Sequence, residues 1–559
     1  LMFRFNNPDA LLVLLLTVSA YTVVRALENG RSRWLVLAGA LLGLAFLTKM
    51  MQAFLVVPGF ALAYLVAGPP RLGKRIGQLL LAGLGIIVGG GWWILVAELV
   101  PAADRPYFGG STNNNILQLA IGYNGLGRLD GSETGSIGGG GGGGGGAFGG
   151  STGITRLFAS EFGGQISWLL PAALIALAAM AWESRRAIRT DRTRAAALLW
   201  GGWLVVTGLV FSYMSGIIHP YYMVALAPAI AALVGIGGMA LWQRALGWLG
   251  RIVCAVAVAV TAGWAFVLLD RTPAWFTWLR WLIVVAGALA VVTILAGPWL
   301  ADRAAVRRGR LVLAGVPVIL ALVAGLAGPA AYAIETVATT HTGSIPSAGP
   351  ASAGGLGGAP GGGTGGGAPG GRSLGAGAPG KTGAAGGAGA TGGTGATGGT
   401  GSRTGAPPGG TGTGTGSAGT GSKGTGAAAG GLGGTGGPGG LSGNTQVSSA
   451  LDKLLEKGAS GYKWVAATVG SQEAAPLELA TEDPVMAIGG FNGTDPTPTL
   501  AQFKAMVANG EIHYYLGANS ESFGGGNSSS AITKWVAAHY KKETVGGTTV
   551  YDLTQLKSS

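Results

Sequence analysis

Long apolar stretches recur through this 559-residue chain as far as residue 334, and they constrain its fold more than any other feature. Segments of about 17 to 25 apolar residues can cross a lipid bilayer as helices. Charged residues make up 11% of the chain, against about 25% in soluble domains. The sequence therefore predicts an all-α polytopic membrane domain over residues 1–337. The ten predicted spans are residues 10–27, 34–48, 52–69, 77–99, 166–183, 195–213, 221–241, 252–269, 280–298 and 311–334.

Basic residues alternate between the connections that join these stretches. The connections after the first, third, fifth, seventh and ninth stretches hold 17 Lys and Arg residues, whereas the other side holds 7, although it includes the long loop 100–165. Cytoplasmic loops of membrane proteins are enriched in Lys and Arg, so the first set is predicted to be cytoplasmic. Asp9, Lys49, His219 and everything after residue 334 are then extracytoplasmic. The net charge of +13 follows from this topology and does not indicate nucleic-acid binding.

Residues 338–445 consist mainly of Gly, Ala, Thr and Pro and hold almost no large apolar residue. Such a segment cannot bury a core, so it is predicted to be a disordered linker. The nine glycines at 138–146 are expected to form a flexible insert in the external loop. Beyond the linker, composition returns to normal, and residues 446–559 are predicted to form a small extracytoplasmic α/β domain. Its expected helices are 448–459, 499–511 and 529–541, and its expected strands are 462–469, 484–491 and 512–518.

Three ionisable residues fall at predicted external ends of spans: Asp9, Lys49 and His219. Ionisable groups at such positions are candidates for function. Each also has a structural interpretation. Asp9 can be a helix cap or a first-turn acid favoured by the helix dipole, Lys49 can extend its ammonium to the interface, and His219 can belong to an interfacial aromatic belt. All three lie on the same predicted side of the membrane, which favours a functional interpretation. A carboxylate, an ammonium and an imidazole can together hold an anionic headgroup and a polar acceptor.

Other catalytic and metal motifs are missing from the sequence. The Gly-rich segment contains G-x-G-x-x-G matches, but none follows a strand or opens a helix. The single cysteine, Cys254, excludes an intrachain disulfide and a cysteine metal site. His341, His513 and His539 are scattered and are expected at the surface. No metal-ligand cluster is predicted, and participation of a divalent cation stays open.

Several segments resemble the polytopic glycosyltransferases of the GT-C fold, which include the protein O-mannosyltransferases and the lipid A aminoarabinose transferases. They include "FRFNNPDALLVLLLTVSAY" at the start, "STNNNILQLAIGYNGLGRL" in the external loop, "SGIIHPYYMVALAP" after the sixth span and "TDPTPTLAQFKAMVANGEIHYYL" in the tail. Together they are similar to a bacterial, actinobacterial branch of mannosyltransferases of the YkcA/YkcB-related type. The resemblance covers nearly the whole chain except the Gly-rich inserts.

The resemblance implies an enzyme that takes a sugar, mannose or another hexose or pentose, from a polyprenyl-phosphate carrier. The acceptor would be an extracytoplasmic lipid, glycan or protein at the plasma membrane. Asp9 matches an acidic residue of the family and is the catalytic candidate, and Lys49 is expected to serve the carrier phosphate. The further expected substrate-binding residues are Asn7, Tyr123, Asn124, His219, Tyr221 and Tyr222. The family's catalytic base lies in an external loop upstream of these residues, so the chain, which starts at Leu1, is expected to be truncated and to lack that loop.

Two other functions fit part of the sequence. A transporter or flippase of lipid-linked sugars would also have many spans, but it should show paired, broken spans in two related halves, and no such duplication is evident. A scaffold that displays the tail domain would account for the tail but not for Asp9, Lys49 and His219 together. The sequence therefore favours the glycosyltransferase.

Overall fold

The computed structural model describes residues 7–101, 104–132, 150–244, 247–303, 307–339, 347–350, 447–491, 493–517 and 527–557. Leu1, the glycine run at 138–146, His341 and nearly all of the predicted linker lie outside the described residues. The chain divides into one unit of residues 1–360 with 436–559 and a second unit of residues 361–435, which also lies outside them.

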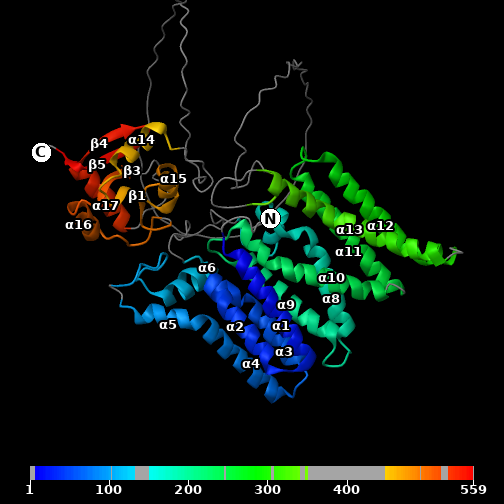
Figure 1. Ribbon diagram of the computed structural model, residues 1–559. Coiled ribbons are helices and arrows are strands. Elements are labelled where there is room, and N and C mark those ends of the chain that lie inside the picture. The colour runs from blue at the N-terminus through cyan, green and yellow to red at the C-terminus, as the bar shows by residue number, and fades with distance from the viewer. Residues whose placement is uncertain are drawn as a thin grey trace, which may run out of the picture. The chain divides into compact units, whose positions relative to one another are not determined.

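The first part of the chain is helical, with short 3₁₀ and π segments (η) between the α-helices (Figure 1). Large apolar side chains such as Leu80 and Ile87 are 71% and 65% exposed, as expected for a surface that faces lipid. The α-helices are α1 Asp9–Asn29, α2 Ser32–Lys49, α3 Val57–Ala67, α4 Leu72–Ile86, α5 Trp92–Leu99, α6 Gly127–Asp130, α7 Ser160–Ile166, α8 Leu170–Ser184, α9 Arg192–Tyr213, α10 Ala227–Arg244, α11 Trp248–Asp270, α12 Thr277–Arg303 and α13 Arg307–Ala338. The other segments are η2 Met50–Val56, η3 Ile87–Gly91, η4 Gln118–Leu126, η5 Arg156–Phe158, η6 Ser167–Leu169 and η7 Pro220–Leu226.

Within the described residues, nine helical stretches are long and apolar enough to cross a membrane. This is one fewer than the ten predicted, because the predicted spans 34–48 and 52–69 fall in one continuous stretch, Ser32–Ala67. The nine stretches confirm a polytopic membrane domain. Apart from this merger, each predicted span overlaps one of the nine.

The chain nevertheless turns back inside the stretch Ser32–Ala67. Met50 has φ 44° and ψ −130°, which ends α2. Gly30, just after α1, lies against Pro70, just after α3, whereas Lys49 at the end of α2 pairs with Asp9 at the start of α1. Since α2 ends where α1 starts, and α3 ends where α1 ends, α2 and α3 run in opposite directions.

Glycines allow α2 to lie very close to α4 and η3. A Cβ at Gly39 would overlap the backbone carbonyl of Ala82, and one at Gly43 would come within 2.7 Å of the Gly90 nitrogen. A Cβ at Gly85 would lie 2.7 Å from the Val36 carbonyl oxygen. Helices in lipid associate through such close van der Waals packing of small residues, because lipid tails supply no hydrophobic driving force between them. We call this contact the glycine seam.

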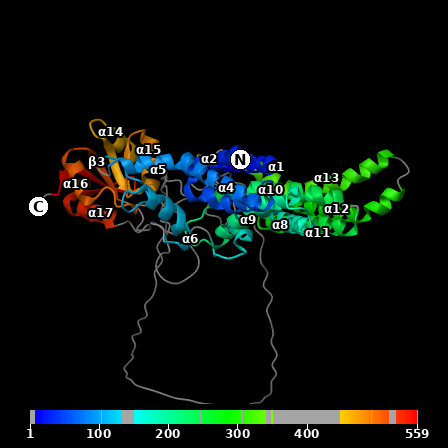
Figure 2. The same cartoon turned by 90° about the horizontal axis from the view of Figure 1, so that it is seen from below.

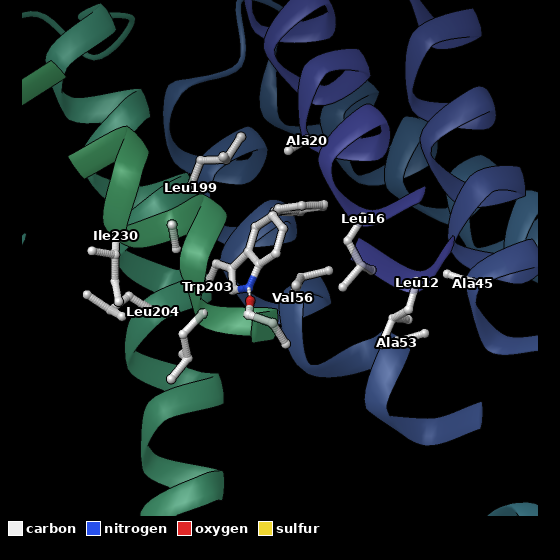
Figure 3. Close-up of a cluster of buried hydrophobic side chains, with 14 of the residues drawn as sticks. Leu12, Leu16, Ala20, Ala45, Ala53, Val56, Leu199, Trp203, Leu204 and Ile230 are labelled. Atoms are coloured by element: carbon white, nitrogen blue, oxygen red, sulfur yellow. Dashed lines mark hydrogen bonds between the residues drawn. The ribbon is translucent and has the colours of Figure 1, made fainter. Parts of the chain in front are cut away.

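Trp203 of α9 forms the centre of the largest buried cluster (Figure 3). It is fully buried, and its indole Nε1 donates a hydrogen bond to the Ala225 carbonyl at 2.9 Å. Leu12 and Leu16 of α1 and Val56 of η2 belong to the same cluster. The start of α1, η2 and α9 are thereby packed into one core, and this core lies beneath the residues of the candidate site.

Arginines lie at the opposite end of these helices. Arg75 donates to the Val66 carbonyl at 3.1 Å, and Arg189 donates to the same carbonyl at 3.1 Å and to that of Gly68. These carbonyls lie at the C-terminal end of α3, where the helix dipole favours positive charge. The structure therefore separates the basic connections from the end that holds Asp9 and Lys49.

The C-terminal part is a small α/β domain with a five-stranded sheet in the order β2-β1-β3-β5-β4. Strand β1 is parallel to β2 and β3, whereas β5 is antiparallel to β3 and β4. Its elements are α14 Ser449–Gly458, β1 Trp464–Val469, α15 Ser471–Thr481, β2 Val485–Ile488, α16 Leu500–Ala508, β3 Ile512–Gly517, α17 Asn527–His539, β4 Tyr540–Val545 and β5 Thr548–Leu556. All six predicted elements are present, and α15, β4 and β5 are additional.

Helices cover both faces of this sheet. Residues of α14 and α15 share one buried cluster with Ala466 and Tyr514, and residues of α16 and α17 share another with Ala467 and Tyr515. Successive side chains of a strand point to opposite faces, so the two clusters lie on the two faces. Figure 2 shows the same elements turned by 90°.

Candidate functional site

Asp9 and Lys49 form a buried ion pair. The Lys49 ammonium donates to both carboxylate oxygens of Asp9, at 2.8 and 2.7 Å. The side chain of Asp9 is 1% exposed and that of Lys49 is 16% exposed. Asp9 lies in the first turn of α1, and Lys49 is the last residue of α2, so the antiparallel pairing of these helices brings the two charges together.

Aromatic rings surround the ammonium of Lys49. Its nitrogen lies 3.7 Å from the ring centroid of Tyr222 and 5.2 Å from that of Tyr221. Cations are attracted to the negative face of such rings. His219 stacks on Tyr221 at a centroid distance of 5.6 Å and an interplanar angle of 17°. The segment "HPYY" before α10 therefore forms one wall around the ion pair.

Arg128 brings a second cation to this wall. Its guanidinium donates to the Ile217 carbonyl at 2.8 Å and to the Tyr222 hydroxyl at 3.4 Å, and it lies 4.9 Å from the ring centroid of Tyr123. Backbone N–H groups of Ser215 and Gly216 donate to the carbonyls of Leu129 and Arg128. The external loop is thus attached to the segment that follows α9.

The electrostatics of the site keep His219 uncharged. Burial, with smaller contributions from the positive charges of Arg128 and Lys49, lowers the pKa of His219 to about 4. The imidazole is therefore neutral near pH 7. One carboxylate and two permanent cations remain, so these groups together carry a net positive charge, which suits an anion.

The structure brings seven of the eight predicted site residues into one connected set of contacts, through Arg128 in the case of Tyr123, and the eighth, Asn124, contacts the residue next to Lys49. Asn7 accepts a hydrogen bond from the Asp9 N–H at 3.0 Å through its side-chain oxygen. The Asn124 side-chain amide lies 3.2 Å from the sulfur of Met50, next to Lys49. Tyr123 contacts Arg128 through its ring and through its backbone carbonyl. What these residues do to a substrate stays a prediction.

The structural interpretations of Asp9 and Lys49 can now be compared with the geometry. Asp9 is not the N-cap of α1, which is Pro8, but an acidic residue of its first turn, and both of its oxygens accept from Lys49. Lys49 turns toward Asp9 and is largely covered. Both side chains are therefore held inward at this end of the helices.

Sequence reasoning missed Arg128. It was counted only as one basic residue of the external loop, although it joins Tyr123 to Tyr222. Its position was the available signal, because an arginine on the side that is otherwise poor in basic residues needs a specific reason. Of the three scattered histidines, His539 is exposed as expected. His513 is not, since its side chain is 12% exposed and stacks on Tyr514.

The residues at the site do not match the ligand set of a divalent cation. Within the described residues there is no group of three or more His, Cys, Asp or Glu side chains that could hold one. Both oxygens of Asp9 are already engaged by an ammonium.

Comparison with known proteins agrees with this architecture at both ends of the chain. Residues 1–93 match the family "Dolichyl-phosphate-mannose-protein mannosyltransferase", and residues 451–539 match the family "Putative mannosyltransferase YkcB-like, C-terminal". The first match covers α1, α2 and the glycine seam. The second covers most of the small α/β domain.

Two relatives from Bacillus subtilis (strain 168) match along nearly the whole chain. "Putative mannosyltransferase YkcB" is 27% identical over 96% of this chain and 74% of its own length. "Putative mannosyltransferase YycA" is 28% identical over 97% of this chain and 76% of its own length. No solved structure matches the chain significantly. The chain is therefore a multi-pass membrane glycosyltransferase that is similar to mannosyltransferases of the GT-C type.

Proposed function

We propose that the protein transfers a sugar, mannose or another hexose or pentose, from a polyprenyl-phosphate carrier to an extracytoplasmic lipid, glycan or protein acceptor. The observation that carries the proposal is the Asp9–Lys49 pair, surrounded by Tyr221, Tyr222 and Arg128 at one end of the helices. The plasma membrane is the proposed location, with this end of the helices outside, and the alternation of basic connections supports that orientation.

The charges explain why a lipid-linked phosphate suits this site. Lys49 and Arg128 supply two cations within one aromatic enclosure, and Asp9 neutralises only one of them. An arriving phosphate competes with Asp9 for the ammonium of Lys49, since a lysine acts as a compact point charge with three donors. When the phosphate takes Lys49, the carboxylate of Asp9 is released toward the sugar or the acceptor.

Transfer then requires one bond to form and one to break. The acceptor oxygen bonds to the anomeric carbon, and the bond from that carbon to the phosphate oxygen breaks with its electron pair on the phosphate. Lys49 and Arg128 stabilise the charge that develops there. The acceptor hydroxyl proton passes to a base. The resemblance assigns the family's base to an external loop upstream of these residues, and among the described residues Asp9 is our candidate. Asn7, Tyr123, Asn124, His219, Tyr221 and Tyr222 are proposed to contact the substrates.

The transporter or flippase is the alternative from another class. It shares the charged enclosure and the many spans but moves the lipid-linked sugar without breaking its bond to phosphate. Incubation of protein-containing membranes with radiolabelled polyprenyl-phosphate sugar, followed by thin-layer analysis, distinguishes the two. Label on a new acceptor, absent from membranes that lack the protein, supports the transferase. Unchanged donor that has only moved across the bilayer overturns it.

We also propose three domains: a membrane domain over 1–337, a linker over 338–445 and an extracytoplasmic domain over 446–559. The linker composition cannot repay the entropy cost of ordering. Protease added to the outside of cells should therefore cut the linker first and release the folded tail. Resistance of the linker, or release only from the cytoplasmic side, would contradict this organisation.

A further inference from the structure

The small α/β domain contains a cavity of about 200 Å³ on the face covered by α14 and α15. Its polar lining comes from Ser448, Thr468, Glu473 and Thr548, and backbone is exposed to it at Gly517. Ligand pockets for drug-sized molecules occupy about 300–1,000 Å³, so this cavity suits a smaller ligand. It belongs to the tail and is separate from the Asp9–Lys49 site.

The cavity lies where the topology of the sheet leaves room for a ligand. β1 and β3 are parallel neighbours, and Thr468 and Gly517 are at their carboxyl ends. The helix that follows β1 packs on one face of the sheet, and the helix that follows β3 packs on the other. Crevices at such switch points, beyond the carboxyl ends of the strands, are the general ligand sites of open α/β sheets.

Glu473 is the unusual side chain of this cavity. Burial raises the pKa of its carboxyl, and no neighbouring charge counteracts the shift. Within the described residues its carboxylate has no hydrogen bond and no ion pair. By contrast, the Asp552 carboxylate of the same domain accepts from Thr554 and Gln555. Its oxygens are not sealed inside the protein, so this carboxylate is open to the cavity and available to accept hydrogen bonds from a ligand.

Thr468 supports the same conclusion. Its side chain is 2% exposed, yet its hydroxyl makes no hydrogen bond within the part of the chain that the structure describes. A hydroxyl both donates and accepts, whereas the carboxylate of Glu473 accepts only. Hydroxyls of a ligand can satisfy both groups at once. Glu473 is also the only charged side chain that lines the cavity within the described residues.

We propose that this cavity binds one sugar residue of an extracytoplasmic glycan, with ligand hydroxyls donating to Glu473 and exchanging hydrogen bonds with Thr468. The apolar faces of Leu451, Leu477 and Leu516 line the rest of the cavity and suit the C–H surface of a sugar ring. Linked to a membrane domain by a long linker, such a site raises the effective concentration of acceptor.

The test uses the full chain in detergent and measures saturation-transfer NMR with the methyl glycosides of mannose, glucose, galactose and arabinose. We expect at least one glycoside to bind, with affinity reduced about tenfold or more in Glu473→Ala and Thr468→Val. Glu478→Gln is the matched control, because Glu478 lies on the same helix but is exposed and outside the cavity. It should bind like the unchanged protein.

Two outcomes would overturn the proposal. One is that none of the four glycosides binds, and the other is that binding is the same in all three variants. Glu473→Gln controls for loss of binding that is caused by misfolding. Removal of a partly buried charge that has no partner within the described residues should not destabilise the domain, but it should still weaken glycoside binding. The readout needs no sugar transfer, so a failure here is distinguishable from a failure of the proposed transferase activity.

Discussion

Asp9 in the membrane domain and Glu473 in the tail occupy the same local position, the first turn of a helix, but in opposite electrostatic environments. Asp9 is almost completely buried and is held by both oxygens on Lys49. Glu473 is partly buried and lacks a partner within the described residues, so burial raises its pKa. A favourable helix dipole exists at both positions. The difference between the two environments therefore comes from tertiary contacts. Asp9 is paired within the protein, whereas Glu473 lines a cavity and is proposed to bind a ligand.

The largest effect that this comparison predicts is a loss of stability when Lys49 is replaced. Lys49→Met keeps most of the apolar stem but leaves the Asp9 carboxylate buried without its cation. Breaking a buried pair in this way costs about 3–5 kcal/mol, so the unfolding midpoint in detergent should fall sharply. The double variant Asp9→Asn with Lys49→Met should recover most of the loss. If the single and double variants are equally unstable, the pair does not stabilise the fold.

Asp9→Asn should have the next largest effect, on sugar transfer. Asparagine keeps the size and one oxygen that can accept from Lys49, but it removes the charge. If the carboxylate acts on the substrates, turnover should fall by about 10²–10³-fold, as when one preorganised polar group is removed from an active site. The measurement is the initial rate of label transfer in membranes. Near-normal turnover would limit Asp9 to a structural role.

Two variants at Tyr222 distinguish the contribution of its aromatic ring to donor binding from that of its hydroxyl. Tyr222→Leu removes the aromatic face 3.7 Å from the Lys49 ammonium, so donor binding should weaken by about 1–2 kcal/mol. Tyr222→Phe keeps that face and loses the hydroxyl, which bonds to Arg128 and to Tyr221, a loss of about 0.5–1 kcal/mol. Titration with a polyprenyl-phosphate sugar measures both. Tyr213→Phe, at an exposed tyrosine of α9, serves as the control, and equal effects in all three variants would refute the proposed enclosure.

The smallest effect is expected at Glu473 and depends on pH. The pKa of this carboxyl is raised above 4.5 in the folded state, so the folded protein binds its proton more tightly than the unfolded chain does. Its contribution therefore destabilises the tail increasingly as pH rises through the folded pKa and vanishes well below 4.5. Glu473→Gln should raise the unfolding temperature of the tail at pH 7 but not at acidic pH. An equal rise at both would show that charge is not the cause.

Most of the fold could be predicted because the sequence carries strong periodic and compositional signals. The spans follow from apolar length, and six elements of the tail follow from alternation and capping residues. α15 was missed because Pro476 inside "SQEAAPLELAT" argues against a helix. The hairpin of β4 and β5 was missed because β4, "YKKETV", is charged and mostly exposed, although Gly546 and Gly547 are a hairpin signal.

The candidate site was predictable as a set of residues but not as a set of contacts. Topology placed Asp9, Lys49 and His219 on one side without showing that Asp9 and Lys49 pair with each other. That pairing depends on the antiparallel packing of α1 and α2, which follows from the tight reversal at Gly30 with φ 66°, and an apolar pattern does not show which side chains then meet. Arg128 was missed for a related reason, because its partners come from segments about 90 residues away along the chain.

The glycine seam has a consequence for how the protein adapts to bilayers of different thickness. A helix that is longer or shorter than the hydrocarbon layer usually responds by tilting. Because α2 and α4 touch backbone to backbone at Gly39, Gly43 and Gly85, they must tilt as one body. Lys49 lies six residues beyond Gly43, about 9 Å along the helix axis. A change in membrane thickness therefore moves this ammonium together with both helices.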